Sequence, residues 1–201
     1  MSTLPQKFYP VVDNAQWVDR LGAAGARFIQ LRVKDMPEPE LRAQVRLARD
    51  YAARHDVCLV LNDFWRIALD EGLSYIHLGQ EDLDTADMTA IRNGQLQVGL
   101  STHCQEELDR ALTFEPDYVA LGPIWETRLK KMAFGPQGVE RLGEWKRQIG
   151  AMPLVAIGGI TLERAPLCLQ AGADCVSAVS AFTQQADPEG QVKAWIAATG
   201  R

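Results

Sequence analysis

The sequence lacks the features that mark a membrane protein, a disulfide scaffold or a nucleic-acid-binding protein. No stretch reaches the roughly 18 apolar residues that a membrane-spanning helix requires, and Met1 to Phe8 contains no apolar core of signal-peptide length. The four cysteines show no C-x-x-C spacing, and no run of Lys or Arg accompanies the net charge of −5. We therefore expect a soluble cytoplasmic protein with buried free thiols and with neither a nucleic acid nor a membrane as partner.

Two kinds of ligand motif are also missing. Neither G-x-G-x-x-G nor G-x-x-x-x-G-K-[ST] occurs, which removes the usual basis for a dinucleotide or a P-loop nucleotide. His55, His77 and His103 show no metal-ligand spacing, so we assign no histidine a catalytic role. His77 is expected to be a satisfied residue of the core or of the layer behind a site.

What is present is a repeated alternation of short apolar runs with helical patterns, which predicts βα units on a parallel sheet. Eight such units occur without a linker or a composition shift. Eight parallel strands with following helices predict a single-domain (β/α)8 TIM barrel over residues 1–201, with an open doubly wound sheet as the alternative. The expected strands are Phe8 to Val12, Arg27 to Val33, Val57 to Leu61, Tyr75 to Leu78, Gln97 to Leu100, Tyr118 to Gly122, Leu154 to Ile157 and Cys175 to Ala178.

The helical patterns are clearest between the second and third strands. Pro37 to His55 carries apolar residues at helical spacing, so this helix is expected to pack on the sheet. Thr102 followed by Gln105 resembles a capping box that opens the helix after the fifth strand.

The second strand ends in alternating charged and apolar residues. Period-two alternation places Gln30, Arg32 and Lys34 on one face and apolar residues on the other, so the polar face is expected to look into the barrel. An arginine pointing into a barrel needs an anionic partner because its desolvation is costly. That partner is either a bound anion or an internal carboxylate such as Asp63.

Two carboxylates follow neighbouring strands. Asn62-Asp63 ends the third strand and Asp82 follows the fourth, so these side chains can share one hard cation such as Mg²⁺. Taken singly, Asp63 also fits a helix N-cap, and Asp82 fits a turn residue.

Phosphate-binding features gather in the last three units. Gly158-Gly159 after the seventh strand and Val179-Ser180 after the eighth lie where such barrels often bind phosphate. The long connection Pro123 to Gln137 is rich in cations and either closes on an anionic substrate or is a solvated charged loop.

Taken in order, these motifs resemble thiamine-phosphate synthases, and the resemblance spans roughly Phe8 to Ser180. The motifs are Gln30-x-Arg32-x-Lys34, Asn62-Asp63, His77-x-Gly79-Gln80-x-Asp82, Gly99-x-Ser101-x-His103, Asp117-Tyr118, Gly122-Pro123-x3-Thr127-x2-Lys130 and Ala156-Ile157-Gly158-Gly159-Ile160.

The resemblance implies a barrel enzyme that joins 4-amino-5-hydroxymethyl-2-methylpyrimidine diphosphate to 4-methyl-5-(2-phosphoethyl)thiazole, giving thiamine phosphate and pyrophosphate. It implies Mg²⁺ as cofactor and these two small molecules as partners, and it leaves a homo-oligomer open. The residues implied to bind the pyrimidine diphosphate are Gln30, Arg32, Lys34, Asn62, Ser101 and Lys130, of which Arg32, Lys34, Ser101 and Lys130 are the catalytic candidates. The residues implied to bind the thiazole phosphate are Thr127, Arg128, Leu129, Gly159, Val179 and Ser180, and Asp63 and Asp82 are the implied Mg²⁺ ligands.

The chain departs from the family pattern at one position. The family usually has Thr-x-Thr-Lys after the sixth strand, and this chain has Thr127-Arg128-Leu129-Lys130. The missing hydroxyl is worth on the order of 1 kcal/mol of phosphate binding, which Arg128 can replace with its charge. Two other functions are considered: a thiazole tautomerase of the same barrel lineage, which needs proton transfer by a side chain, and a non-catalytic sensor of phosphate ligands.

Overall fold

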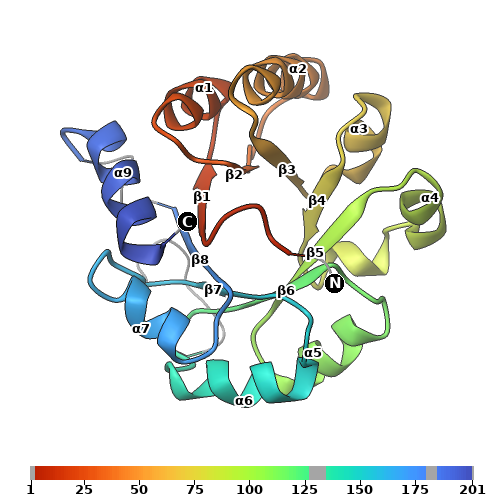
Figure 1. The fold of residues 1–201 in the computed structure, drawn as a ribbon. Coiled ribbons are helices and arrows are strands. Elements are labelled where there is room, and N and C mark those ends of the chain that lie inside the picture. Colours follow the sequence, from red (N-terminus) through yellow and green to blue (C-terminus); the bar gives the residue numbers. More distant parts are fainter. Residues whose placement is uncertain (1–2, 127–134, 180–184, 201) are drawn as a thin grey trace.

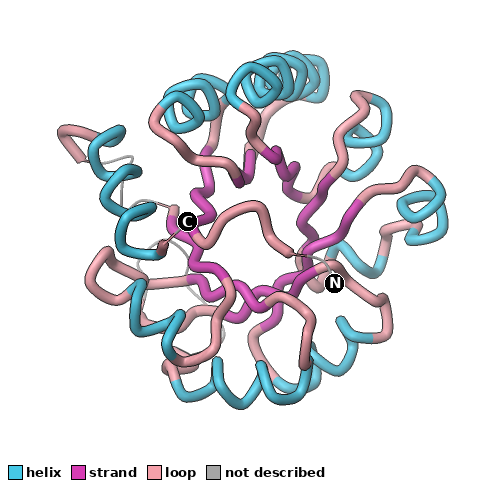
Figure 2. The backbone as a smooth tube through the Cα atoms, viewed as in Figure 1, coloured by secondary structure: helices cyan, strands magenta, loops and turns pink. Residues whose placement is uncertain are grey.

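The computed structural model describes residues 3–126, 135–179 and 185–200. Its eight strands are all parallel and close into one barrel in the order β1-β2-β3-β4-β5-β6-β7-β8 (Figure 1). The helices form an outer ring around this sheet (Figure 2). The expected (β/α)8 barrel is confirmed, and the open sheet is excluded because β1 pairs with β8.

The strands lie where the sequence predicted them. Four agree with the prediction end to end, and the other four differ by one or two residues at one end or at both ends. The strands are β1 Phe8–Val12, β2 Phe28–Leu31, β3 Cys58–Asn62, β4 Tyr75–Leu78, β5 Gln97–Thr102, β6 Tyr118–Leu121, β7 Leu154–Ile157 and β8 Cys175–Ala178.

The described helices are α1 Ala15–Ala23, α2 Glu38–His55, α3 Trp65–Asp70, α4 Met88–Asn93, α5 Gln105–Leu112, α6 Glu140–Ile149, α7 Ala165–Gln170 and α9 Pro188–Thr199, with a 3-10 turn η1 at Asp82–Asp84. Helix α2 buries the apolar stripe that predicted it, and Pro37 occupies its N-cap. Within the described parts of the chain, no helix has the length and apolar character needed to cross a membrane.

The predicted capping box before α5 is wrong. Strand β5 runs on to Thr102, whose hydroxyl donates to the backbone oxygen of Ala120 at 2.8 Å. Cys104 occupies the N-cap instead, and the carboxylate of Glu107 accepts from the backbone N–H of His103 at 2.7 Å. The threonine side chain is therefore used by the barrel rather than by the helix.

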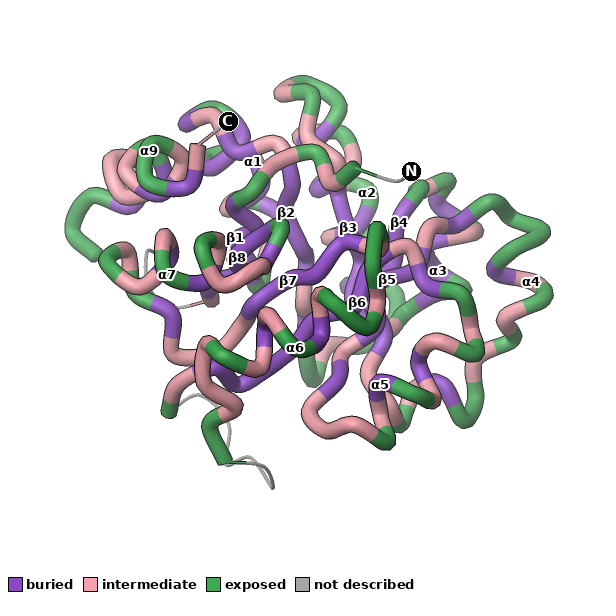
Figure 3. Tube along the Cα trace, turned by 60° about the horizontal axis from the view of Figure 1, so that its bottom comes forward, coloured by how far each residue is buried: buried purple, intermediate pink, exposed green. Residues whose placement is uncertain are grey.

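Two apolar layers hold the barrel, and Figure 3 shows its strands as mostly buried. The outer layer fills the space between strands and helices and includes Ile29 and Leu31. The inner cluster consists of Tyr9, Phe28, Val60, Tyr75, Tyr118, Ala120, Val155 and Cys175. Alternation along β2 therefore runs as predicted, with Phe28 inside and its neighbour Ile29 outside.

The segment before β1 crosses one opening of the barrel (Figures 1 and 2). Leu4 packs against the inner cluster there. The side chain of Gln6 holds the segment in place, since it donates to the Gly25 oxygen at 3.3 Å and accepts from the Arg27 N–H at 2.9 Å. The polar strand ends lie at the opposite, carboxyl-terminal opening, where (β/α)8 barrels carry their active sites.

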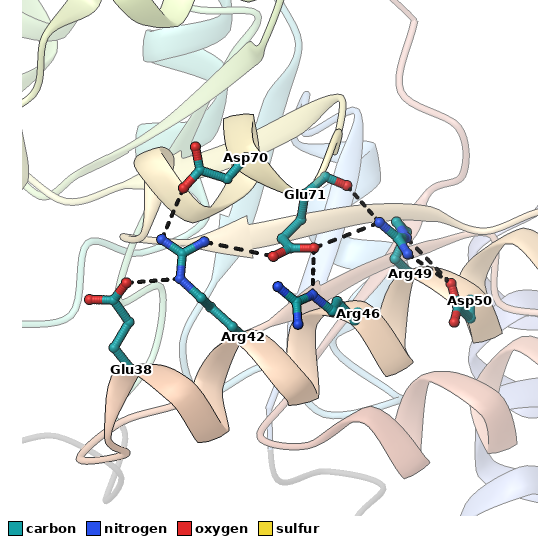
Figure 4. Close-up of polar contacts among 7 residues, drawn as sticks. All are labelled: Glu38, Arg42, Arg46, Arg49, Asp50, Asp70 and Glu71. Carbon is teal, nitrogen blue, oxygen red and sulfur yellow. Dashed lines mark hydrogen bonds and ion pairs between the residues drawn. The ribbon is translucent and has the colours of Figure 1, made fainter.

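A cluster of charges joins α2 to the residue that follows α3 (Figure 4). The Glu71 side chain is only 7% exposed and accepts from Arg46 Nε at 2.9 Å, with Arg42 and Arg49 at 3.7 and 3.8 Å. These arginines hold the pKa of the Glu71 carboxyl below its usual value, through the Arg46 hydrogen bond first. Because Glu71 precedes β4, this cluster lies at the amino-terminal end of the strands, opposite the opening that carries the polar strand ends.

Candidate active site

The carboxyl ends of β2, β3 and β4 bring charges of both signs together. Arg32 and Lys34, which follow β2, both act electrostatically on the carboxyl group of Asp63, which follows β3. The backbone N–H of Asp63 donates to the His77 oxygen of β4 at 2.9 Å, so these two strand ends are in direct contact. The sequence prediction that these residues share one end of the sheet is thereby confirmed.

Asp63 and Asp82 form a carboxyl pair. Asp63 has a φ of 65°, a left-handed conformation that aspartate tolerates better than most residues. Asp82 is fixed from the other side because its Oδ2 accepts from the Gly79 N–H at 2.8 Å. The two carboxyl groups hydrogen-bond one another; burial and then the Asp82 charge raise the pKa of Asp63 to about 6, against the opposing effect of Arg32 and Lys34.

The alternative roles of these two residues have different outcomes. Phe64, rather than Asp63, occupies the N-cap of α3, and no side-chain hydrogen bond caps that helix. The N-cap interpretation of Asp63 is therefore wrong. Asp82 does stabilise its own turn through Gly79, and its carboxyl group contacts Asp63 at the same time.

This pair offers the donor set that a hard divalent cation requires. Where two carboxyl groups lie so close that one of them favours a proton, a divalent cation could take the place of that proton. Among the described residues, no group of three or more His, Cys, Asp or Glu side chains comes together to hold a metal. A cation here would thus take two acidic ligands from the protein and complete its shell with substrate oxygens and water, as Mg²⁺ usually does.

The cations beside the pair lack protein counterions within the described chain. Neither Arg32 nor Lys34 forms an ion pair within 4.0 Å of a described acidic residue. The internal salt bridge from Arg32 to Asp63 that the sequence left open is therefore not formed. Arg32 is half-buried and Lys34 is exposed, so both can face a bound anion at the opening.

A chain of hydrogen bonds runs through the barrel interior beneath these charges. Gln30 Nε2 donates to the Tyr9 hydroxyl at 2.9 Å, and the Tyr9 and Tyr118 hydroxyls are 2.9 Å apart. His77 Nδ1 lies 2.7 Å from the Tyr118 hydroxyl, and His77 Nε2 lies 2.7 Å from Ser101 Oγ. Burial, with a smaller contribution from Arg32, lowers the pKa of His77 to about 4, so the ring is neutral.

His77 is thus a satisfied buried residue behind the opening, as the sequence predicted. The sequence predicted no role for Tyr9 or Tyr118, although Tyr118 belongs to the Asp117-Tyr118 motif. The signal that was available is their alternation within β1 and β6, which places both rings inside the barrel.

The glycines after β7 are packed against the connection after β6. Gly159 has a φ of +66°, and a Cβ there would lie 2.6 Å from the Glu126 oxygen and 2.8 Å from Trp125 Cβ. Arg164, for which no role was expected, donates to the Gly159 oxygen at 2.8 Å, and its guanidinium lies 4.8 Å from the Trp125 ring centroid. These contacts join two loops that the resemblance assigns to the thiazole phosphate.

The structure describes the positions of most of the expected site residues. Asn62 is buried at the end of β3, Ser101 and Val179 are half-buried, and all three lie at or beside carboxyl ends of strands. The expected residues Thr127, Arg128, Leu129, Lys130 and Ser180 lie outside the described residues.

Comparison with known proteins gives one consistent result. The family model described as thiamine monophosphate synthase matches residues 6–182. The chain is 55% identical over 192 residues to the thiamine-phosphate synthase of Rhizobium etli, covering 96% of this chain and 94% of that relative. It is 45% identical over 193 residues to the thiamine-phosphate synthase of Neisseria meningitidis serogroup A, covering 96% and 94%.

A solved structure agrees with the sequence relatives. The thiamine phosphate pyrophosphorylase of Pyrococcus furiosus superimposes with a TM-score of 0.85 at 25% identity, covering 96% of this chain and 95% of that one. Residues 6–182, which the family model matches, include every expected site residue. The chain belongs to the thiamine monophosphate synthase family.

Proposed function

We propose that the open end of this barrel uses a divalent cation, Mg²⁺, to carry out the condensation reaction of its family. The chain is a transferase that joins the pyrimidine diphosphate to the thiazole phosphate and releases pyrophosphate. The observation that carries the mechanistic part is the Asp63–Asp82 pair facing Arg32 and Lys34. Adjacent positive and paired negative groups suit a metal-bound diphosphate better than either charge alone.

The reaction breaks the bond between the pyrimidine methylene carbon and the diphosphate oxygen. The bonding electrons leave with pyrophosphate, and the methylene carbon becomes a cation stabilised by the pyrimidine ring. Bound Mg²⁺ would neutralise the charge that develops on the departing pyrophosphate. Arg32 and Lys34 contact the same oxygens, with Lys130 and Ser101 as further donors.

The second half of the reaction forms a carbon–nitrogen bond. The thiazole nitrogen already carries a lone pair, so it attacks the methylene carbon without a strong general base. Its position is set by the phosphate at the other end of the molecule, for which Gly159, Val179 and Ser180 and the segment Thr127-Arg128-Leu129 are the proposed contacts. Gln30 and Asn62 are the proposed contacts of the pyrimidine.

Two further statements are proposed on the sequence features alone. The cytoplasmic location rests on the absence of an apolar run long enough to span a membrane. The oligomeric state stays open, with a homo-oligomer among the alternatives.

The test combines product formation with metal removal. Purified protein, both substrates and Mg²⁺ should yield thiamine phosphate and pyrophosphate in equal amounts. EDTA should abolish turnover, and excess Mg²⁺ should restore it. Undiminished turnover in EDTA would contradict the metal assignment, whereas isomerisation of the thiazole alone would identify a tautomerase, and binding of both substrates without product would identify a sensor.

A further inference from the structure

Five side chains from five strands form a continuous hydrogen-bonded chain across the barrel interior, and the reaction described above does not explain it. The chain runs Gln30, Tyr9, Tyr118, His77, Ser101, and each of its four links is 2.7 to 2.9 Å long. Gln30, Tyr9, Tyr118 and His77 are buried, and Ser101 is half-buried at the open end.

The donors and acceptors give this chain a direction. The Gln30 amide nitrogen can only donate, so the Tyr9 oxygen accepts from it. The Tyr9 hydroxyl then donates its one hydrogen bond to the Tyr118 oxygen, and the Tyr118 hydroxyl donates a hydrogen bond to His77 Nδ1. In the neutral ring that remains, Nε2 carries the proton and donates to Ser101 Oγ.

This direction determines where the hydroxyl proton of Ser101, the last residue of the hydrogen-bonded chain, can point. The Ser101 oxygen is occupied as an acceptor by His77, so the serine's proton points elsewhere. Ser101 lies at the carboxyl end of β5, on the side of the barrel where Asp63, Asp82 and Arg32 gather. A proton offered there suits an anionic oxygen of a diphosphate.

We propose that this hydrogen-bond chain fixes Ser101 as a donor to the substrate diphosphate. Tyr118 is the positioning residue, because its hydroxyl donates to His77 Nδ1 and thereby keeps the ring proton on Nε2, facing Ser101. The part concerning the substrate rests on the proposed function. The opposite direction, in which the Gln30 oxygen faces Tyr9, would reverse every proton and leave Ser101 donating to His77.

The packing shows that the barrel is built around Tyr118. A Cβ on Gly99 would lie 2.0 Å from Tyr118 Cζ and 2.4 Å from its hydroxyl, so only glycine leaves room for this ring. The Tyr118 ring stacks on His77 at 5.6 Å and meets the edge of Tyr9 at 6.0 Å. The hydroxyl is thereby held between its two partners.

The direction can be measured without substrate or metal. In protein labelled with ¹⁵N at histidine, long-range ¹H–¹⁵N correlation spectra distinguish a protonated from an unprotonated ring nitrogen. Only three histidines contribute, and His77→Gln identifies the signals of His77. We expect the proton on Nε2 and a bare Nδ1 at pH 7; a proton on Nδ1 would overturn the proposal.

Substitutions then test the role of Tyr118. Tyr118→Phe removes the donor to Nδ1, so the tautomer ratio of His77 should shift and kcat should fall about tenfold, the worth of one hydrogen bond, with the KM for thiazole phosphate unchanged. Tyr9→Phe should have the same effect to a smaller degree. Tyr75→Phe removes a hydroxyl from the same inner cluster but outside the chain, and should change neither the tautomer nor kcat.

The outcomes separate this proposal from the proposed function. If the wild-type protein forms no thiamine phosphate, the function fails, and the spectra alone still decide the direction. If the protein turns over and Tyr118→Phe shifts the tautomer but keeps the wild-type kcat, the role of Ser101 as an oriented donor is overturned. Equal losses of kcat in Tyr118→Phe and Tyr75→Phe would also overturn it, since they would indicate packing alone.

Discussion

The carboxyl groups of Asp63 and Asp82 hydrogen-bond one another at the open end of the barrel, with one delivered by the end of β3 and the other by the turn after β4. Above the pKa of Asp63 both groups are ionised, and the two like charges then destabilise the metal-free fold. The same contact is the basis of the proposed Mg²⁺ site. Stability and function are therefore expected to oppose each other at this pair.

The first prediction concerns Asp63→Asn. The pKa of Asp63 is about 6 in the folded protein, against an ordinary value of 3.8 for an aspartate. The folded state thus binds the proton more tightly, and the stabilisation this gives at low pH is lost as pH rises from about 4 to about 6. At pH 7 in chelator, Asp63→Asn should raise the free energy of unfolding by about 1 kcal/mol, a figure that allows for partial solvent exposure.

The control for this prediction is Asp56→Asn. Asp56 has a φ of 54°, close to the 65° of Asp63, and lies at the other end of the barrel as the C-cap of α2. It should change neither metal-free stability nor the response to Mg²⁺. Asp63→Asn should lose both turnover and the stabilisation by Mg²⁺ in thermal unfolding. A variant that is less stable than wild type in chelator would contradict the assignment of repulsion.

Most of the site follows from the sequence because parallel strands end at the same edge. Arg32, Asp63, Asp82 and Ser101 each follow or end a strand whose apolar run is easy to recognise, so the topology alone brings them together. The hydrogen-bonded chain could not be predicted in this way. Its Tyr9–Tyr118 link joins residues 109 positions apart, and such a contact depends on the register of a closed barrel.

A local sequence motif gave a wrong prediction where a strand is longer than expected. Thr102 resembles a helix cap only if β5 ends at Leu100, and the strand continues to Thr102 itself. Arg164 gave no signal because its partners, the Gly159 oxygen and the Trp125 ring, belong to two loops whose contact the sequence does not show.

The second prediction separates backbone strain from close approach at Gly159. Gly159→Ala places a Cβ within 2.8 Å of two neighbouring atoms, so the loops after β6 and β7 must move apart. We expect a loss of about 2 kcal/mol of stability and a several-fold higher KM for thiazole phosphate.

Gly72→Ala is the matched control for that substitution. Gly72 has a φ of +68° against +66° for Gly159, and a Cβ there would meet nothing within 4 Å. It should lower stability by about 1 kcal/mol through strain alone and leave KM unchanged. Thermal unfolding and titration of thiazole phosphate measure the two effects; equal KM values in both variants would show that this loop contact does not shape the phosphate site.

The third prediction concerns stability at the other end of the barrel. The arginines around Glu71 lower the pKa of its carboxyl group in the folded protein. The ionised Glu71 therefore stabilises the fold above pH 4.5, the pKa in the unfolded chain, and this stabilisation is lost as the pH falls through the lower pKa of the folded state. Glu71→Gln should lower the free energy of unfolding by about 2 kcal/mol at pH 7 and by less at pH 3.

The control for Glu71→Gln is Asp50→Asn. This substitution removes the ion pair between Asp50 and Arg49, in which the Asp50 side chain is 65% exposed. That variant should lose less than about 0.5 kcal/mol at either pH, because exposed ion pairs contribute little. Urea unfolding at the two pH values measures both. A deficit of Glu71→Gln that persists unchanged at pH 3 would assign the loss to packing instead of charge.

The last prediction concerns Leu129, which stands where the family pattern has a threonine and which lies outside the described residues. If Arg128 does not replace the missing hydroxyl, Leu129→Thr should lower the KM for thiazole phosphate by up to about tenfold, the worth of one hydrogen bond to an anion, with kcat little changed. If Arg128 does replace it, Leu129→Thr should be nearly neutral, and Arg128→Ala should raise that KM. Titrating thiazole phosphate at saturating pyrimidine diphosphate decides between the two. A KM that responds to neither substitution would show that this segment does not contact the phosphate.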